Sequence, residues 1–172
     1  MLLSCAQLCD SVFERMPTIE IATYIAARQD ICFDLARDID LHIQTTVGTN
    51  ERAVKGVTSG LIGPGEEVTW QATHFGIRQT LTSRITAFDR PRHFRDSQVS
   101  GLFQHFDHDH FFSTGPNGVL MRDVFDYQSP FGWLGRWADH IFLCSYMTAF
   151  LLRRAKVIKE TAERGTAEPL LR

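Results

Sequence analysis

The sequence predicts an α+β domain in which an antiparallel sheet of about seven strands packs against one long C-terminal helix. The first observation is the segment Gly132–Arg164, which contains no proline and carries apolar residues at helical spacing. The second is the chain before it, where short runs of alternating apolar and polar residues are separated by turn sequences. Because consecutive strands joined by short turns pair antiparallel, we expect one sheet that covers the apolar face of the helix.

The long helix is expected to begin after Pro130, since proline suits the entry of a helix and not its interior. Gly165 stands where a C-terminal stop belongs. Between Ile141 and Leu152 almost every residue is apolar, which predicts that this part is covered on most sides. A helix that spans a bilayer needs about 20 apolar residues, and this run is far shorter, so no integral membrane segment is expected.

The remaining elements follow from changes of period along the chain. Residues 18–27 alternate as a first strand. Residues 28–40 change to a helical period and predict one or two short helices, with Asp30 as a candidate N-cap. Six more segments have the pattern of strands, namely 51–55, 66–75, 76–88, 94–100, 102–112 and 119–127.

The glycine-rich loop 58–65 allows two interpretations, a phosphate-binding loop or a turn. A phosphate-binding loop leads into a helix N-terminus, whereas an alternating strand follows here, so the turn is favoured. The sequence Ser-Thr-Gly-Pro-Asn-Gly at 113–118 predicts a second turn, between the last two strands.

Composition indicates one globular domain. The chain has 172 residues, 44% of them hydrophobic and 22% charged, with a net charge of -2 that gives no electrostatic footprint for nucleic acid. We expect a loosely ordered extension at 1–17, a single domain at 18–165 and a frayed tail at 166–172. The four cysteines are scattered and complete no zinc signature, which favours reduced thiols in a cytoplasmic protein.

Several stretches together resemble a known group of proteins. They are 70–76 (WQATHFG), 88–91 (FDRP), 94–96 (FRD), 103–110 and 123–127 (DVFDY), followed by Pro130 and Gly132. In these stretches, and in the order of elements from about 18 to 163, the chain resembles the polyketide cyclase/dehydrase-like proteins of the START-like (SRPBCC) superfamily. The resemblance implies a helix-grip fold, in which a curved seven-stranded sheet wraps around the C-terminal helix and leaves a deep apolar cavity. It also implies binding of lipids, polyketides or other hydrophobic molecules, and cyclisation or dehydration in some relatives.

The densest polar cluster is Gln-His-Phe-Asp-His-Asp-His at 104–110. On a strand, His108 and His110 share one face with Phe106. Two histidines at alternate positions can reach one metal ion, with Asp123 or His74 as a third ligand. The cluster has no diagnostic metal spacing, however, so we expect no metal or other cofactor, and no metal requirement for folding.

The turn at 113–118 predicts how the last two strands pair. If it is centred between Gly115 and Pro116, the opposed pairs are Phe112 with Val119, His110 with Met121, His108 with Asp123, and Phe106 with Phe125. A His108–Asp123 pair would raise the His pKa and orient the ring. It can form a polar patch at one end of the cavity that anchors a ligand carbonyl or hydroxyl, or it can simply stabilise the hairpin.

The leading hypothesis is binding or carriage of a hydrophobic small molecule, such as a lipid, a polyketide or an aromatic compound. The second is a cyclase/dehydratase-type enzyme with His108 or His110 as general base and Asp123 orienting it. The third is a protein-interaction module, with a homodimer as one form. The ligand-binding candidates are Trp70, His74, Phe106, His108, His110, Asp123, Phe125, Tyr127 and Tyr146. Core packing explains Trp70 about as well as a cavity wall does, and for Tyr146 it is the first explanation, with ligand contact secondary.

Overall fold

The computed structural model describes residues 17–46, 49–74, 76–129 and 142–167. Its strands and helices follow the predicted order. They are β1 (Thr18–Ile25), α1 (Gln29–Ala36), α2 (Ile39–Thr45), β2 (Arg52–Gly56), β3 (Glu67–His74), β4 (Ile77–Asp89), β5 (His93–Ser100), β6 (His105–Gly115), β7 (Gly118–Gln128) and α4 (Cys144–Ala167).

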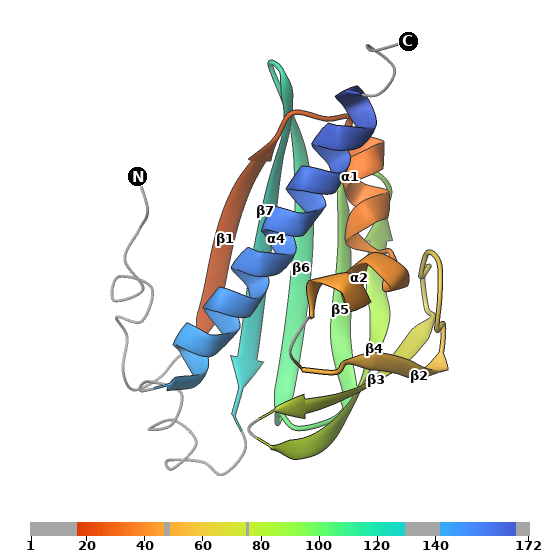
Figure 1. The fold of residues 1–172 in the computed structure, drawn as a ribbon, viewed down its shortest axis with the longest axis vertical. Helices are drawn as coiled ribbons and strands as arrows, with labels where there is room; N and C mark the ends of the chain where they lie inside the picture. Colours follow the sequence, from red (N-terminus) through yellow and green to blue (C-terminus); the bar gives the residue numbers. More distant parts are fainter. Residues whose placement is uncertain (1–16, 47–48, 75, 130–141, 168–172) are drawn as a thin grey trace.

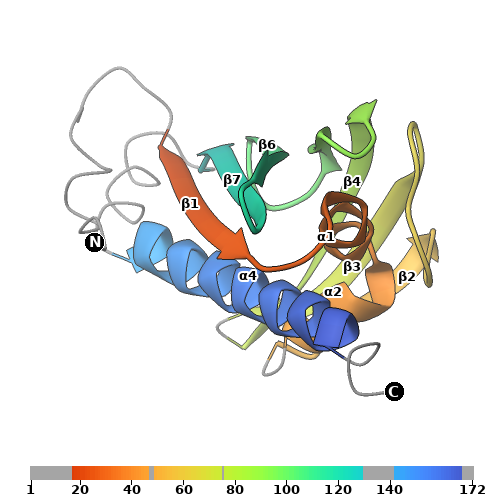
Figure 2. The same ribbon diagram turned by 90° about the horizontal axis from the view of Figure 1, so that it is seen from above.

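The seven strands form one antiparallel sheet in the order β1-β7-β6-β5-β4-β3-β2. The sheet is curved, and the described helices α1, α2 and α4 lie on one side of it (Figures 1 and 2). Helix α4 crosses this side diagonally and contacts β1, α1 and α2. The predicted antiparallel sheet with a long C-terminal helix is therefore confirmed.

The long helix differs from the prediction at its C-terminal end. Its expected start at Gly132 lies outside the described residues, and the described part of α4 begins at Cys144. The helix does not end at Gly165 but continues to Ala167. Gly165 is not among the glycines with positive φ, so it does not adopt the left-handed conformation that commonly ends a helix.

The short helices also differ from the prediction at one residue. Asp30 does not cap α1, because the helix begins at Gln29 and Asp30 lies in its first turn. Instead, Asp38 caps α2, where its Oδ1 accepts a hydrogen bond of 2.9 Å from the backbone N–H of Leu41. This cap turns the chain sharply between the two helices.

The core lies between the sheet and the helices. Phe33 of α1 is fully buried and packs edge-to-face against the rings of Phe88, Phe94 and Phe112 at 5.3–5.5 Å. Helix α4 also contributes buried side chains to this core, namely those of Leu151, Ala155, Ile158 and Ala162. Because α1 contacts β6 and β7 and α4 contacts β1 on the same side of the sheet, the inner-face side chains of β6 and β7 are buried.

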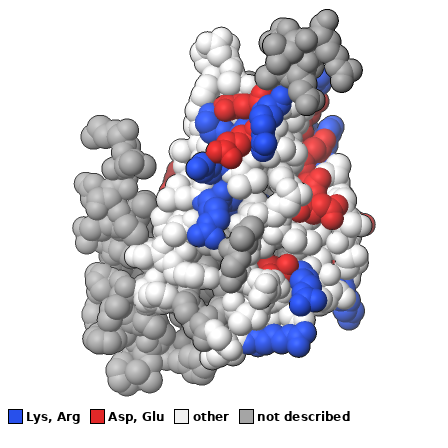
Figure 3. Space-filling view, in the orientation of Figure 1, with Lys and Arg blue, Asp and Glu red and all other residues white. Residues whose placement is uncertain are grey.

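Charges of both signs are interspersed on the outer face of α4 and α1 (Figure 3). Two i,i+4 pairs contribute, with Lys156 Nζ 3.8 Å from Glu160 and Lys159 Nζ 2.5 Å from Glu163. Among the described residues, no helix combines the length and the apolar character needed to cross a membrane.

Candidate functional site

A cavity of about 140 Å³ lies between the sheet and α4. It is close in volume to apolar cavities of about 150 Å³ that accommodate one benzene ring. Apolar and aromatic side chains form most of its wall. The lining residues are His42, Glu51, Trp70, Ala72, Gln79, Thr80, Leu81, Ser83, Asp96, Leu102, Phe103, Phe106, His108, Phe125, Leu143, Tyr146, Met147, Phe150, Leu151 and Arg154.

The structure divides the predicted ligand-binding residues into two groups. Five of them line the cavity, namely Trp70, Phe106, His108, Phe125 and Tyr146. His110, Asp123 and Tyr127 are buried in the sheet beside the cavity and are not part of its wall. The backbone of His74 ends β3 opposite Ile77, and its side chain lies outside the described part of the structure.

The pairing of β6 with β7 differs from the predicted register by two residues. The turn consists of Pro116 and Asn117, with Gly115 opposite Gly118. His110 therefore lies opposite Asp123, and the predicted opposition of His108 and Asp123 is wrong. The observed pairs are Phe106 with Tyr127, His108 with Phe125, His110 with Asp123, and Phe112 with Met121.

The reason for this register lies in the turn. Pro116, with its fixed φ, suits the first central position of a two-residue turn, and Asn117 suits the second. A two-residue shift leaves every side chain on its original face, because side chains alternate with a period of two. His108 and His110 therefore still point to the inner side of the sheet together with Phe106 and Phe112, as predicted.

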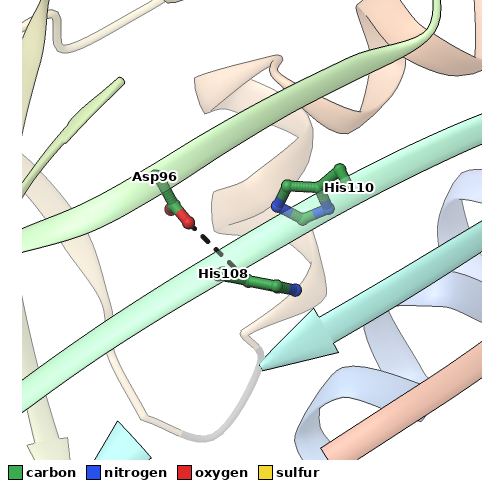
Figure 4. A group of neighbouring side chains, drawn as sticks. All are labelled: Asp96, His108 and His110. Atoms are coloured by element: carbon green, nitrogen blue, oxygen red, sulfur yellow. Dashed lines mark ion pairs between the residues drawn. The ribbon is translucent and has the colours of Figure 1, made fainter. Parts of the chain in front are cut away.

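Asp123 lies between the two histidines. Its Oδ1 is 2.5 Å from Nδ1 of His110 and 3.5 Å from Nε2 of His108. On the other side of His108, Nδ1 is 3.8 Å from Oδ1 of Asp96 on β5. The imidazole centroids of His108 and His110 are 3.9 Å apart. The four side chains form a continuous polar row from the cavity wall into the core, of which Figure 4 shows Asp96, His108 and His110.

The pKa values of His110 and Asp123 are both lowered, for different reasons. Burial lowers the pKa of His110 to about 4, with the charge of His108 acting in the same direction, and the favourable contact with Asp123 does not compensate. The predicted rise of the His pKa is therefore wrong for the histidine that actually pairs with Asp123. For Asp123 itself, burial raises the pKa, but the contacts with His108 and His110 outweigh it and hold the pKa well below its usual range. The pair is thus a neutral imidazole bonded to a carboxylate at neutral pH.

Four ionisable residues of the cavity wall were not among the predicted site residues, namely His42, Glu51, Asp96 and Arg154. His42 stacks on Trp70 with centroids 4.2 Å apart, and its Nε2 lies 3.5 Å from Oε1 of Glu51. Of these four residues, only Asp96 could have been placed at the site from the sequence, because it shares a strand face with buried Phe94 two residues earlier. The others come from three distant segments, so local spacing could not have indicated them.

Solved structures provide the comparison with known proteins, since no protein-family model and no curated protein sequence match this chain. TTHA0849 from Thermus thermophilus is 15% identical, with a TM-score of 0.70, over 87% of this chain and 99% of that one. Major latex-like protein 151 from Panax ginseng is 16% identical, with a TM-score of 0.63, over 87% of this chain and 99% of that one. The di-domain ARO/CYC StfQ from the steffimycin biosynthetic pathway is 12% identical, with a TM-score of 0.70, over 89% of this chain and 52% of that one. At these identities the likeness concerns the fold.

Proposed function

The chain has the START-like helix-grip fold, and on this basis we propose that it binds a hydrophobic small molecule in the cavity between the sheet and α4. The observation that carries the proposal is the cavity wall, in which Trp70, Phe106 and Phe125 of the sheet face Met147 and Phe150 of α4. Apolar pockets with a few polar groups are the usual form of a small-molecule site.

The cavity volume and its polar groups suggest the size and chemistry of the ligand. About 140 Å³ suits one aromatic ring or a short aliphatic segment. Asp96 and His108 supply hydrogen-bonding groups in one part of the wall, and Glu51 and His42 supply them in another. A ring that carries hydroxyl or carbonyl groups would satisfy both kinds of contact.

A cavity-filling substitution tests the proposal. Ala72 on β3 lines the cavity, so the ring of Ala72→Phe would occupy the space of a ligand. Isothermal titration with 4-methylphenol, which has a single ring and a hydroxyl group, should show saturable binding to the parent chain and about tenfold or greater weakening in Ala72→Phe. Leu120→Phe is the matched control, because Leu120 of β7 is 42% exposed and lies outside the cavity.

Two results would count against carriage. One is an absence of saturable 4-methylphenol binding to the folded parent chain, and the other is equal binding to Ala72→Phe. If Ala72→Phe does not fold, Met147→Trp fills the same space from α4. Native mass spectrometry of protein purified from its own host would then identify any retained ligand.

The second candidate function is a cyclase/dehydratase-type reaction. It is favoured by the position of His108, which lines the cavity and has Asp123 behind it at 3.5 Å. His110 does not reach the cavity wall, so His108 is the better candidate for the general base. In a β-hydroxy ketone, His108 would take the proton next to the carbonyl and return it to the leaving hydroxyl. The C–O bond then breaks, water departs, and a carbon–carbon double bond conjugated with the carbonyl forms.

Dehydration of 4-hydroxy-4-phenylbutan-2-one, followed by the absorbance of the conjugated product, tests this reaction. We expect His108→Gln to abolish turnover and to retain 4-methylphenol binding, whereas His105→Gln, on the opposite face of β6, should behave like the parent. An absence of turnover by the parent chain would contradict the dehydratase candidate and favour carriage.

The homodimer is a separate prediction, which sedimentation equilibrium tests.

A further inference from the structure

We propose that Asp96, His108 and His110 bind one divalent first-row transition-metal ion at the edge of the cavity (Figure 4). One ligand atom from each of the three side chains lies within 4.8 Å of the other two. Two imidazole nitrogens and one carboxylate oxygen are a common ligand set for such ions. This inference does not depend on the proposed hydrophobic ligand.

The sheet holds the three side chains together. His108 and His110 occupy alternate positions of β6 and therefore point to the same face, while Asp96 is the direct partner of His108 on β5. Metal–ligand bonds of about 2.0–2.2 Å require the three ligand atoms to approach one another by about 1 Å. We expect rotation of the side chains, and not movement of the backbone, to supply this approach.

Three buried atoms of the cluster lack a hydrogen-bond partner among the described residues, namely Oδ1 of Asp96, Nε2 of His108 and Nε2 of His110. His110 itself is fully buried. Leaving such groups unpaired in the interior is unfavourable, and an ion bound by Oδ1 of Asp96 and Nε2 of His110 would remove the penalty at these two atoms. This is the independent observation that points to a ligand at this position.

Asp123 orients both histidines toward the same point. It contacts Nδ1 of His110 at 2.5 Å, which leaves Nε2 of that ring as the metal ligand. It also faces Nε2 of His108 at 3.5 Å, while Nδ1 of His108 faces Asp96 at 3.8 Å. Metal-binding histidines usually have such a carboxylate behind them, which fixes the orientation of the ring.

The ligand chemistry also limits which ion can bind. Calcium and magnesium prefer sites made only of oxygen ligands, which this cluster does not offer. The carboxylates of Asp96 and Asp123 favour a dication. The positive charge of Arg154 in the cavity wall acts in the opposite direction, since it disfavours positive charge at His110. Zinc, cobalt, nickel and ferrous iron fit the cluster. Because Asp96 and His108 line the cavity, a bound ion would keep an open position toward it.

The test is titration of chelator-treated full-length protein with Zn²⁺ by calorimetry and with Co²⁺ by visible absorption. We expect one tight equivalent, and on the order of tenfold to hundredfold weaker binding for Asp96→Asn and for His108→Gln. His105→Gln is the matched control, since His105 lies on the same strand, is 44% exposed and is not part of the cluster. Its affinity should equal that of the parent chain.

Three results would overturn the proposal. They are no tight equivalent in the folded parent chain, undiminished affinity in Asp96→Asn, and loss of the equivalent in His105→Gln, which would indicate surface histidines as ligands. Circular dichroism of each variant confirms that it is folded. If His108→Gln does not fold, the affinity of Asp96→Asn for the metal ion is the deciding measurement. This variant should fold, because the Asp96 side chain is 25% exposed and asparagine has nearly the same shape.

Discussion

Nδ1 of His110 and Oδ1 of Asp123 lie 2.5 Å apart at directly opposed positions of β6 and β7. Both side chains are buried, with His110 fully enclosed and Asp123 6% exposed. The contact ties together the neighbouring strands β6 and β7 and fixes which nitrogen of His110 faces the carboxylate. It is therefore both a structural pair and the support of the polar row beside the cavity.

Asp123→Asn should destabilise the protein by about 1–3 kcal/mol, because it replaces the charged partner of a buried hydrogen bond with a neutral amide. Chemical denaturation at neutral pH measures the change in the free energy of unfolding. Glu20→Gln is the control, since Glu20 is 46% exposed and its 3.3 Å contact with Arg122 is worth little. Equal unfolding midpoints for Asp123→Asn and the parent would show that the pair does not contribute to stability.

Removal of metal ions by a chelator should leave the fold intact. The strand pairing and the His110–Asp123 contact require no ion, so circular dichroism before and after treatment should be the same. If the proposed site exists, addition of Zn²⁺ should raise the melting temperature, because an ion that binds only the folded state stabilises it by mass action. Unfolding caused by the chelator itself would contradict this prediction.

Gly118→Ala should destabilise the protein by about 1–3 kcal/mol through overpacking. A Cβ atom at Gly118 would overlap the backbone carbonyl oxygen of Ile25 in β1, which cannot move without disturbing the β1–β7 pairing. Gly115→Ala on the other side of the same turn is the matched control. There the nearest atom is Cε2 of Tyr24 at 3.6 Å, an ordinary contact. Thermal unfolding of both variants measures the difference, and similar melting temperatures would contradict the overlap.

The alternation of apolar residues was enough to predict the strands and their buried faces. Phe106, Phe112, Val119 and Phe125 are all buried as predicted. A period of two is unchanged by a two-residue slip, so the same pattern could not decide between His108 and His110 as the partner of Asp123. That choice depends on where the turn is centred, which the sequence 113–118 leaves open by one residue.

Contacts between distant segments set the rest of the site. Asp96 meets His108 only because β5 pairs with β6, and His42 meets Glu51 and Trp70 only because α2 lies over β3. Local spacing carries no information on such contacts. The pKa of His110 likewise depends on full enclosure by the surrounding elements, and the sequence indicated only an apolar strand face.

The last prediction concerns Asp109, on the opposite face of β6 from His108. Its carboxylate accepts hydrogen bonds from Nε and Nη2 of Arg95 at 2.9 and 2.7 Å, and lies 2.6 Å from Nε2 of His93. Burial raises the pKa of Asp109, but the contacts with Arg95 and His93 outweigh it and lower the pKa below its ordinary value of 3.8. Because the folded-state pKa is the lower one, the unfolded chain binds this proton more readily.

The stabilisation from Asp109 should therefore be complete above the ordinary Asp pKa and disappear as the pH falls through the lower folded-state pKa. Asp109→Asn should be less stable than the parent at neutral pH, and the difference should shrink below about pH 4. Denaturation midpoints measured across this range test it, with Glu160→Gln as the control because Glu160 is 53% exposed. A stability difference that is the same at neutral and acid pH would mean that packing, and not the charge of Asp109, holds β5 and β6 together on this face.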